Sequence, residues 1–133
     1  MDRIYKLWIL LGHIQRRRRE ECIDPITLRS QLAAVHRVSR VELARVDLLG
    51  GSLLDEGEKA LWAHALTRND AWLLCGPDGA SMRFGFQQGL RDRLVALGSL
   101  LNDIGHRPRV PLRTQYERAW LDRLIHDLVM GIL

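Results

Sequence analysis

Cysteine is scarce in this chain of 133 residues, and the two cysteines that it has stand alone. Cys22 and Cys75 lie far apart and form no CxxC or other metal-binding spacing. The five histidines likewise give no pair of metal ligands at helical spacing. We therefore expect ordinary histidines and two reduced thiols, one of them buried in a strand, in a cytoplasmic protein.

Long apolar runs are also missing. The segment Leu7–Leu11, with basic residues before it, superficially resembles a signal peptide. It is too short to span a bilayer, lacks a small-residue cleavage site and is followed, after four further residues, by Arg16–Arg19. No membrane partner is predicted, and the chain has no internal repeats or low-complexity tracts.

The length and the apolar content of 47% suffice for a single core, because a chain of this size buries roughly two thirds of its unfolded surface. We predict one domain over 1–133. It would consist of a helical N-terminal part (1–40), an α/β core (41–105), and a connector with a C-terminal helix (106–133). The net charge of +4 is unevenly spread, with a slightly acidic centre and basic flanks. That distribution suits either a cation site that tolerates a polyanion or simply solvated helix faces.

The most informative stretch, Asp55–Asp103, alternates helical and strand patterns. Apolar residues within Glu58–Leu66 have helical spacing, and Ala71–Cys75 is an apolar run typical of a buried strand. An amphipathic segment follows to Gln88, and Arg93–Leu97 predicts a second short strand. This alternation indicates an α/β fold with a short, mainly parallel sheet flanked by helices.

The flanking segments are predicted from the same kinds of signal. Helices are expected over Asp2–Glu21 and again after Asp24, where Pro25 suits a first turn. β-branched residues favour a short strand over Val41–Val46. The segment HRPRVPLR after Gly105 indicates a connector, because its prolines fit neither helix nor strand.

The final helix is predicted over Thr114–Leu133. Thr114 and Glu117 have capping-box spacing. A wide apolar stripe runs along this helix, and it would pack onto the domain or onto another subunit. The stripe comprises Trp120, Leu121, Leu124, Leu128 and Val129.

The candidate chemistry rests on two carboxylates. Glu58 lies in the first turn of its helix, and Asp78 follows the first buried strand, where ligands of parallel sheets bind. Carboxylates held together repel one another, and a divalent cation relieves that repulsion. Two structural alternatives remain open: Glu58 has capping-box spacing from Asp55, and Asp78 is an ordinary turn residue. Further acids that would contribute are Asp55, Glu56 and Asp103.

Three segments together resemble the carboxyl-terminal half of a PIN domain. They read LDEGEKALWAHAL, DAWLLCGPDGASMR and RLVALGSLL. In that family a Gly-Glu pair opens a helix, a short hydrophobic strand ends in a loop with an aspartate, and a last short strand leads into a terminal helix. The resemblance covers roughly residues 41–105 and is moderately specific, because its motifs are short.

The resemblance implies a PIN-like three-layer fold and a toxin-type, Mg²⁺- or Mn²⁺-dependent endoribonuclease. It implies Glu58 and Asp78 as catalytic residues and metal ligands, Arg83 as a phosphate-binding residue, and RNA, an antitoxin-like protein or a second copy as partners. PIN domains begin with a strand that ends in an aspartate, and nothing before Asp55 has that form. The resemblance is therefore also compatible with a truncated or inactive relative of this family.

Two alternatives stay open beside the nuclease. One is a non-catalytic protein-interaction module that uses the apolar stripe of the final helix. The other is a basic nucleic-acid-binding protein that uses Arg16–Arg19, although such a run is often a solvated helix end.

Overall fold

The computed structural model describes residues 26, 36–76 and 78–132. The helices predicted over Asp2–Glu21 and after Asp24 lie outside the described residues, apart from isolated positions of the second. The chain divides into two compact units, Met1–Trp72 and Leu73–Leu133, which we call the first and the second unit. The prediction of one domain over 1–133 stays a prediction.

The first unit begins, in its described part, with helix α3 (Arg40–Val46). Ser39 caps it, because its hydroxyl oxygen accepts a hydrogen bond from the Glu42 N–H at 3.2 Å and donates one to Glu42 Oε1 at 3.0 Å. The strand predicted over Val41–Val46 is therefore wrong. β-branched residues favoured a strand, but the cap and the spacing of the inward residues, Leu43 and Val46, fit a helix.

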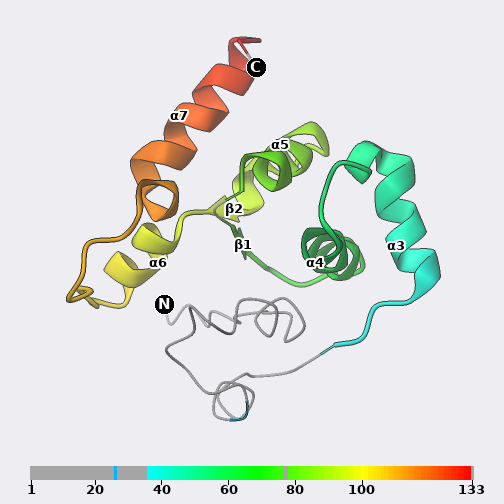
Figure 1. The fold of residues 1–133 in the computed structure, drawn as a ribbon, viewed down its shortest axis with the longest axis horizontal. Coiled ribbons are helices and arrows are strands. Elements are labelled where there is room, and N and C mark those ends of the chain that lie inside the picture. Colours follow the sequence, from blue (N-terminus) through cyan, green and yellow to red (C-terminus); the bar gives the residue numbers. More distant parts are fainter. Residues whose placement is uncertain (1–25, 27–35, 77, 133) are drawn as a thin grey trace. The chain divides into compact units, whose positions relative to one another are not determined.

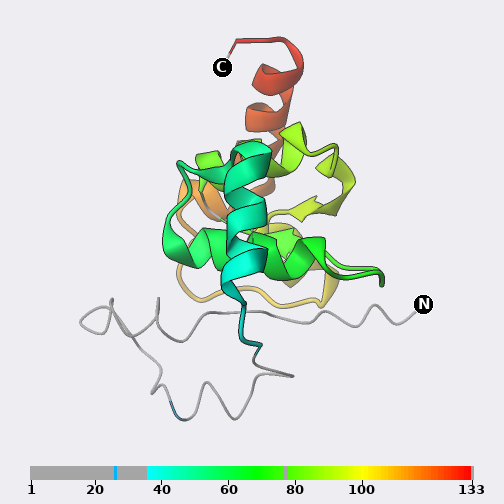
Figure 2. The ribbon, with the colours of Figure 1, turned by 90° about the vertical axis from the view of Figure 1, so that its right-hand side faces the viewer.

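A π-type turn, η2 (Asp47–Gly51), follows α3 directly. The backbone angles stay helical until Gly50, whose φ of +99° is easily adopted only by glycine. The chain then reverses into helix α4 (Glu56–Leu66), which packs against α3 (Figures 1 and 2). The helix predicted over Glu58–Leu66 is confirmed and starts two residues earlier.

The core of the first unit is centred on Trp62, which is fully buried. Trp62 meets Trp72 edge to face, with 6.2 Å between the ring centroids. Val46 of α3 is fully buried as well, so the inner faces of both helices supply this core. In the described part of this unit, the other buried apolar residues are Leu54, Ala63 and Ala65.

The second unit contains a β–α–β arrangement. Strand β1 (Leu74–Cys75) leads to helix α5 (Gly79–Gln87), then through η3 (Arg91–Arg93) to strand β2 (Leu94–Val95). The strands pair in parallel, with Leu74 opposite Leu94 and Cys75 opposite Val95. The predicted alternation is confirmed as a mixed α/β fold with a short parallel sheet, whereas the three-layer PIN-like arrangement stays a prediction.

Both strands are shorter than the apolar runs that predicted them, Ala71–Cys75 and Arg93–Leu97. A ladder extends only as far as both partners stay extended, and here Leu97 already opens helix α6 (Leu97–Asp103). On the other strand, Ala71 is exposed. Pairing is thus limited to the last two residues of the first run, Leu74 and Cys75, and to Leu94 and Val95 of the second.

Helix α7 (Arg118–Val129) packs against α5 and α6 (Figure 1). Leu121 and Ile125 are its buried residues, so the predicted apolar stripe serves in part as core of the second unit. Residues 106–113 form neither helix nor strand, which confirms the predicted connector. The other buried side chains of this unit are Leu74, Ser81, Met82, Phe84 and Ala96.

The capping box predicted for Thr114 and Glu117 is wrong. Thr114–Tyr116 forms a 3₁₀ turn (η4), in which the Arg113 carbonyl accepts from the Tyr116 N–H at 2.9 Å. Glu117 is extended (φ −86°, ψ 148°), so α7 begins only after it, and no described side chain caps its first turn. The two residues thus lie before the helix and cannot form its first turn.

Candidate functional site

Glu58 has a structural role that the sequence left open. Its backbone N–H donates to Asp55 Oδ1 at 2.8 Å, and its Oε2 accepts from the Asp55 N–H at 3.1 Å. This reciprocal pair is a capping box, and it confirms the structural alternative for Glu58. The negative charge also lies in the first turn of α4, at the positive end of the helix dipole.

Asp78 lies at the carboxyl end of β1, where it caps helix α5. Its Oδ1 accepts hydrogen bonds from the N–H groups of Ala80 at 2.8 Å and Ser81 at 3.1 Å. The residue is exposed, and among the described residues none contacts Oδ2. The sequence predicted a turn residue here, and the structure shows Asp78 as the N-cap of α5, at the edge of the sheet where ligands of parallel sheets bind.

Glu58 belongs to the first unit and Asp78 to the second. No group of three or more His, Cys, Asp or Glu side chains suited to a metal ion occurs in the ranges that the structure describes. Mg²⁺ often keeps several waters and binds through one or two carboxylates. The donor chemistry therefore fits Mg²⁺ or Mn²⁺, and the site itself stays a prediction.

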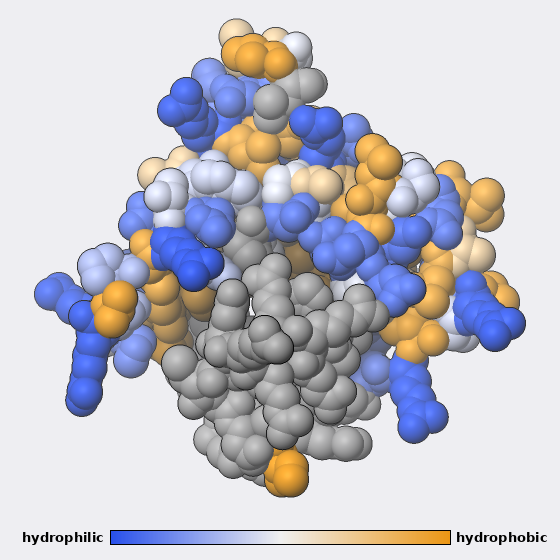
Figure 3. Space-filling model, in the orientation of Figure 1, coloured by the Kyte–Doolittle hydropathy of each residue, from blue (hydrophilic) through white to orange (hydrophobic). Residues whose placement is uncertain are grey.

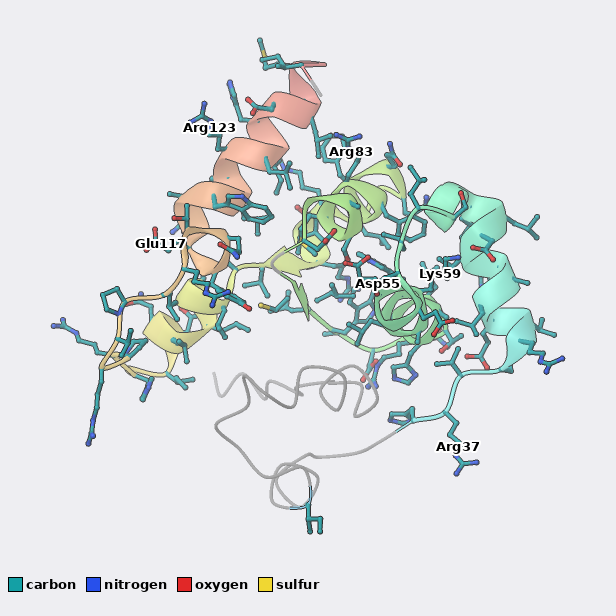
Figure 4. The ribbon with its side chains drawn as sticks, in the orientation of Figure 1. Arg37, Asp55, Lys59, Arg83, Glu117 and Arg123 are labelled. Atoms are coloured by element: carbon teal, nitrogen blue, oxygen red, sulfur yellow. The ribbon has the colours of Figure 1, made fainter. Side chains whose placement is uncertain are left out.

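Arg83, the predicted phosphate ligand, lies on α5 in the same unit as Asp78 (Figure 4). Its side chain is exposed, and the described part of the chain gives it no acidic partner. Asp103, one of the further acids, is the last residue of α6 and is exposed. Asp55 is the N-cap of α4, and Glu56 stands beside Glu58 in its first turn.

A polar cluster in the first unit was not predicted. The rings of His36 and His64 stack with 4.2 Å between their centroids and 25° between their planes. Arg68 Nη1 lies 3.3 Å from His64 Nε2. Because a guanidinium only donates, this nitrogen of His64 is the acceptor. Asp70 in turn holds Arg68, accepting from its Nε at 2.8 Å and from its Nη2.

The surroundings of His64 keep it neutral near pH 7. Burial lowers the pKa of His64 below its usual 6.5, and the nearby His36 and Arg68 lower it further. Glu42 and Asp70 act in the opposite direction but do not cancel these effects. The hydrogen bond to Asp70 raises the pKa of Arg68, so that guanidinium stays charged.

Part of this cluster had a visible signal in the sequence. His64 and Arg68 are four positions apart at the end of one predicted helix, which is the spacing of neighbours on a helix surface. His36 is far away in sequence, and its segment was predicted to lead into a strand. Only the turn of the chain through α3 and η2 brings the two imidazoles together.

The second unit also has a groove of about 470 Å³. It lies between the η3–β2 segment and α7, and it combines apolar side chains with charges of both signs. One arginine stands against two aspartates, so this groove has no positive excess that would attract a polyanion. Its lining comprises Arg91, Asp92, Leu94, Asp122, Ile125, His126 and Val129.

Comparison of the chain with protein-family models, curated proteins and solved structures found no match. The PIN resemblance therefore rests on the three sequence segments given above. A separate question is membrane insertion: across the described ranges, no helix has both the length and the apolar character needed to cross a bilayer.

Proposed function

We propose that this protein is a PIN-like endoribonuclease that depends on Mg²⁺ or Mn²⁺. The observation that carries the proposal is the parallel β1–α5–β2 arrangement with Asp78 at the carboxyl end of β1. This is the order and the position that the PIN resemblance predicts for an acidic ligand. The short sheet and the helix opened by Gly57 and Glu58 are in keeping with it.

In this proposal the carboxylates of Glu58 and Asp78 hold the cation. Two backbone N–H groups fix Asp78 Oδ1, which orients the carboxylate and leaves Oδ2 for a ligand. A cation held by these residues would supply an activated water and would stabilise charge on the phosphodiester. Arg83 contributes a positive side chain for the RNA phosphate, and it follows Asp78 on the same helix.

The test is RNA cleavage by the purified chain in Mn²⁺, in Mg²⁺ and in EDTA. The variants are Glu58→Gln and Asp78→Asn, because each keeps a carbonyl oxygen for the helix cap and removes the charge. We expect each variant to lose about 100-fold or more of the activity, the scale of one lost transition-state contact. Asp122→Asn, at an exposed acid on α7, is the matched control and should cleave as the wild type does.

A second readout does not require activity. Mn²⁺ should raise the midpoint of thermal unfolding of the wild type but not that of Glu58→Gln or Asp78→Asn, because ligands stabilise only the state that binds them. Cleavage that persists in EDTA or in both variants contradicts the proposal. A Mn²⁺-dependent stabilisation without cleavage identifies an inactive relative instead.

A further inference from the structure

Helix α3 carries apolar side chains on its outer face. Val41 is 79% exposed and Leu48 is 88% exposed. The backbone angles stay helical from Arg40 to Leu49, so Val41, Ala44 and Leu48 recur at the spacing of one helix face. Figure 3 shows apolar surface interrupted by hydrophilic side chains in this region, at the right of the view.

Among the described residues, the core of the first unit does not use this outer face. Val46, on the opposite side of α3, is fully buried, and Leu43 is half-buried. Just beyond η2, Leu53 is a further large apolar residue, 91% exposed. Scattered exposed leucines are ordinary, but several gathered along one short element indicate an interaction site.

Arginines surround this apolar face. Arg37, Arg40 and Arg45 are exposed, and no described acidic side chain pairs with any of them. Arg37 points away from the ribbon in Figure 4. The two acids of α3 and η2 already have partners. Asp47 pairs with Lys59 at 2.8 Å, and Glu42 accepts a hydrogen bond from the Ser39 hydroxyl. The outer face of α3 is therefore apolar along its middle and positive at its margins.

We propose that this face binds an amphipathic, acidic segment of another protein. The α3 surface is defined by Arg37, Arg40, Val41, Arg45 and Leu48. Apolar side chains of the partner would cover Val41 and Leu48, and its Asp or Glu side chains would pair with the arginines. Such complementarity steers association and excludes wrong partners. Residues 40–49 extend about 15 Å, the length of roughly three helical turns of a partner.

Other occupants match this surface less well. If a second copy of the chain bound through this same surface, its arginines would lie against Arg40 and Arg45, and contacts between like charges are costly. Nucleic acid would satisfy the arginines but would leave Val41 and Leu48 without apolar partners. The proposal does not depend on the nuclease, because the residues of the α3 surface are distinct from Glu58, Asp78 and Arg83.

The test uses two synthetic helical peptides as probes. Both carry leucines at positions i, i+3 and i+7, and they differ only in their flanking residues, glutamate in one and lysine in the other. Fluorescence anisotropy with the full chain should show at least tenfold tighter binding of the glutamate peptide, a difference of about 1.4 kcal/mol. Leu48→Asp and Arg45→Glu should each weaken that binding about tenfold.

The control is Ile104→Asp, which places the same charge at an exposed apolar residue of the second unit and should leave binding unchanged. Circular dichroism of each variant confirms that the helices are retained. Equal affinity for both peptides, or Leu48→Asp binding as the wild type does, overturns the proposal. Wild-type self-association that Leu48→Asp abolishes, or RNA or anionic vesicles bound in place of the glutamate peptide, overturns it too. Loss of RNA cleavage in Glu58→Gln with unchanged peptide binding separates this proposal from the nuclease.

Discussion

Helices α3 and α7 have similar amphipathic patterns but use them differently. In α7, Leu121 and Ile125 are buried within the second unit, so this helix supplies part of that unit's core, while Val129 near its end is exposed. In α3 one face is buried through Val46, whereas Val41 and Leu48 on the other face are exposed. An apolar stripe therefore shows which residues favour burial, but the neighbouring elements decide whether the chain itself provides it.

The largest expected effect distinguishes these two helices directly. Leu121→Ala should destabilise the second unit by about 2–5 kcal/mol, because it leaves a cavity in a packed core. Leu48→Ala should change the unfolding free energy by no more than about 0.5 kcal/mol, because its side chain is exposed. Urea denaturation of both variants measures the contrast, and similar losses would show that Leu48 is core as well.

A smaller loss of stability is expected when the acidic helix caps of the two units are removed. Asp55→Ala and Asp78→Ala should each cost about 0.5–2 kcal/mol, because each leaves helix N–H groups without an acceptor. Asp78→Asn keeps an oxygen for Ala80 and should cost much less. Thermal unfolding of the three variants tests this, and equal losses for the Ala and Asn changes at Asp78 would mean that the charge, not the cap, stabilises α5.

The smallest expected effect concerns acid pH and the first unit. The pKa of His64 is lower in the folded protein than in the unfolded chain, so folding favours the neutral ring. Its stabilising contribution is complete above pH 6.5 and is lost as the pH falls through the lowered pKa. The melting temperature should therefore drop less between pH 7 and pH 5 in His64→Gln than in the wild type. His126→Gln, at an exposed histidine of α7, should keep the wild-type slope.

Local signals predicted the parts of the fold that local chemistry determines. The Asp55–Glu58 capping box and the connector after Gly105 are present as predicted, whereas Asp78, predicted as a turn residue, caps helix α5. The prediction of a strand over Val41–Val46 was wrong because β-branched residues favour strands only weakly. The Ser39 cap, together with burial against α4, outweighs that preference.

The candidate site could be predicted only in part. The capping role of Glu58 follows from its spacing from Asp55, whereas Asp78 was predicted only as a turn residue. A role of the two residues in holding a cation would depend on contacts between distant residues. The stack of His36 on His64 was missed for the same reason. The α3 surface was missed because assigning the wrong period to this segment places Val41 and Leu48 on different faces.

The low reactivity of the Cys75 thiol follows from its place in β1. Burial raises its pKa to about 11, so at pH 7 only about one thiol in ten thousand is ionised. The thiolate is the form that attacks electrophiles and disulfides. This cysteine should therefore react very slowly with maleimides or oxidised glutathione while the protein stays folded, and rapid labelling at this position would report local opening of the strand.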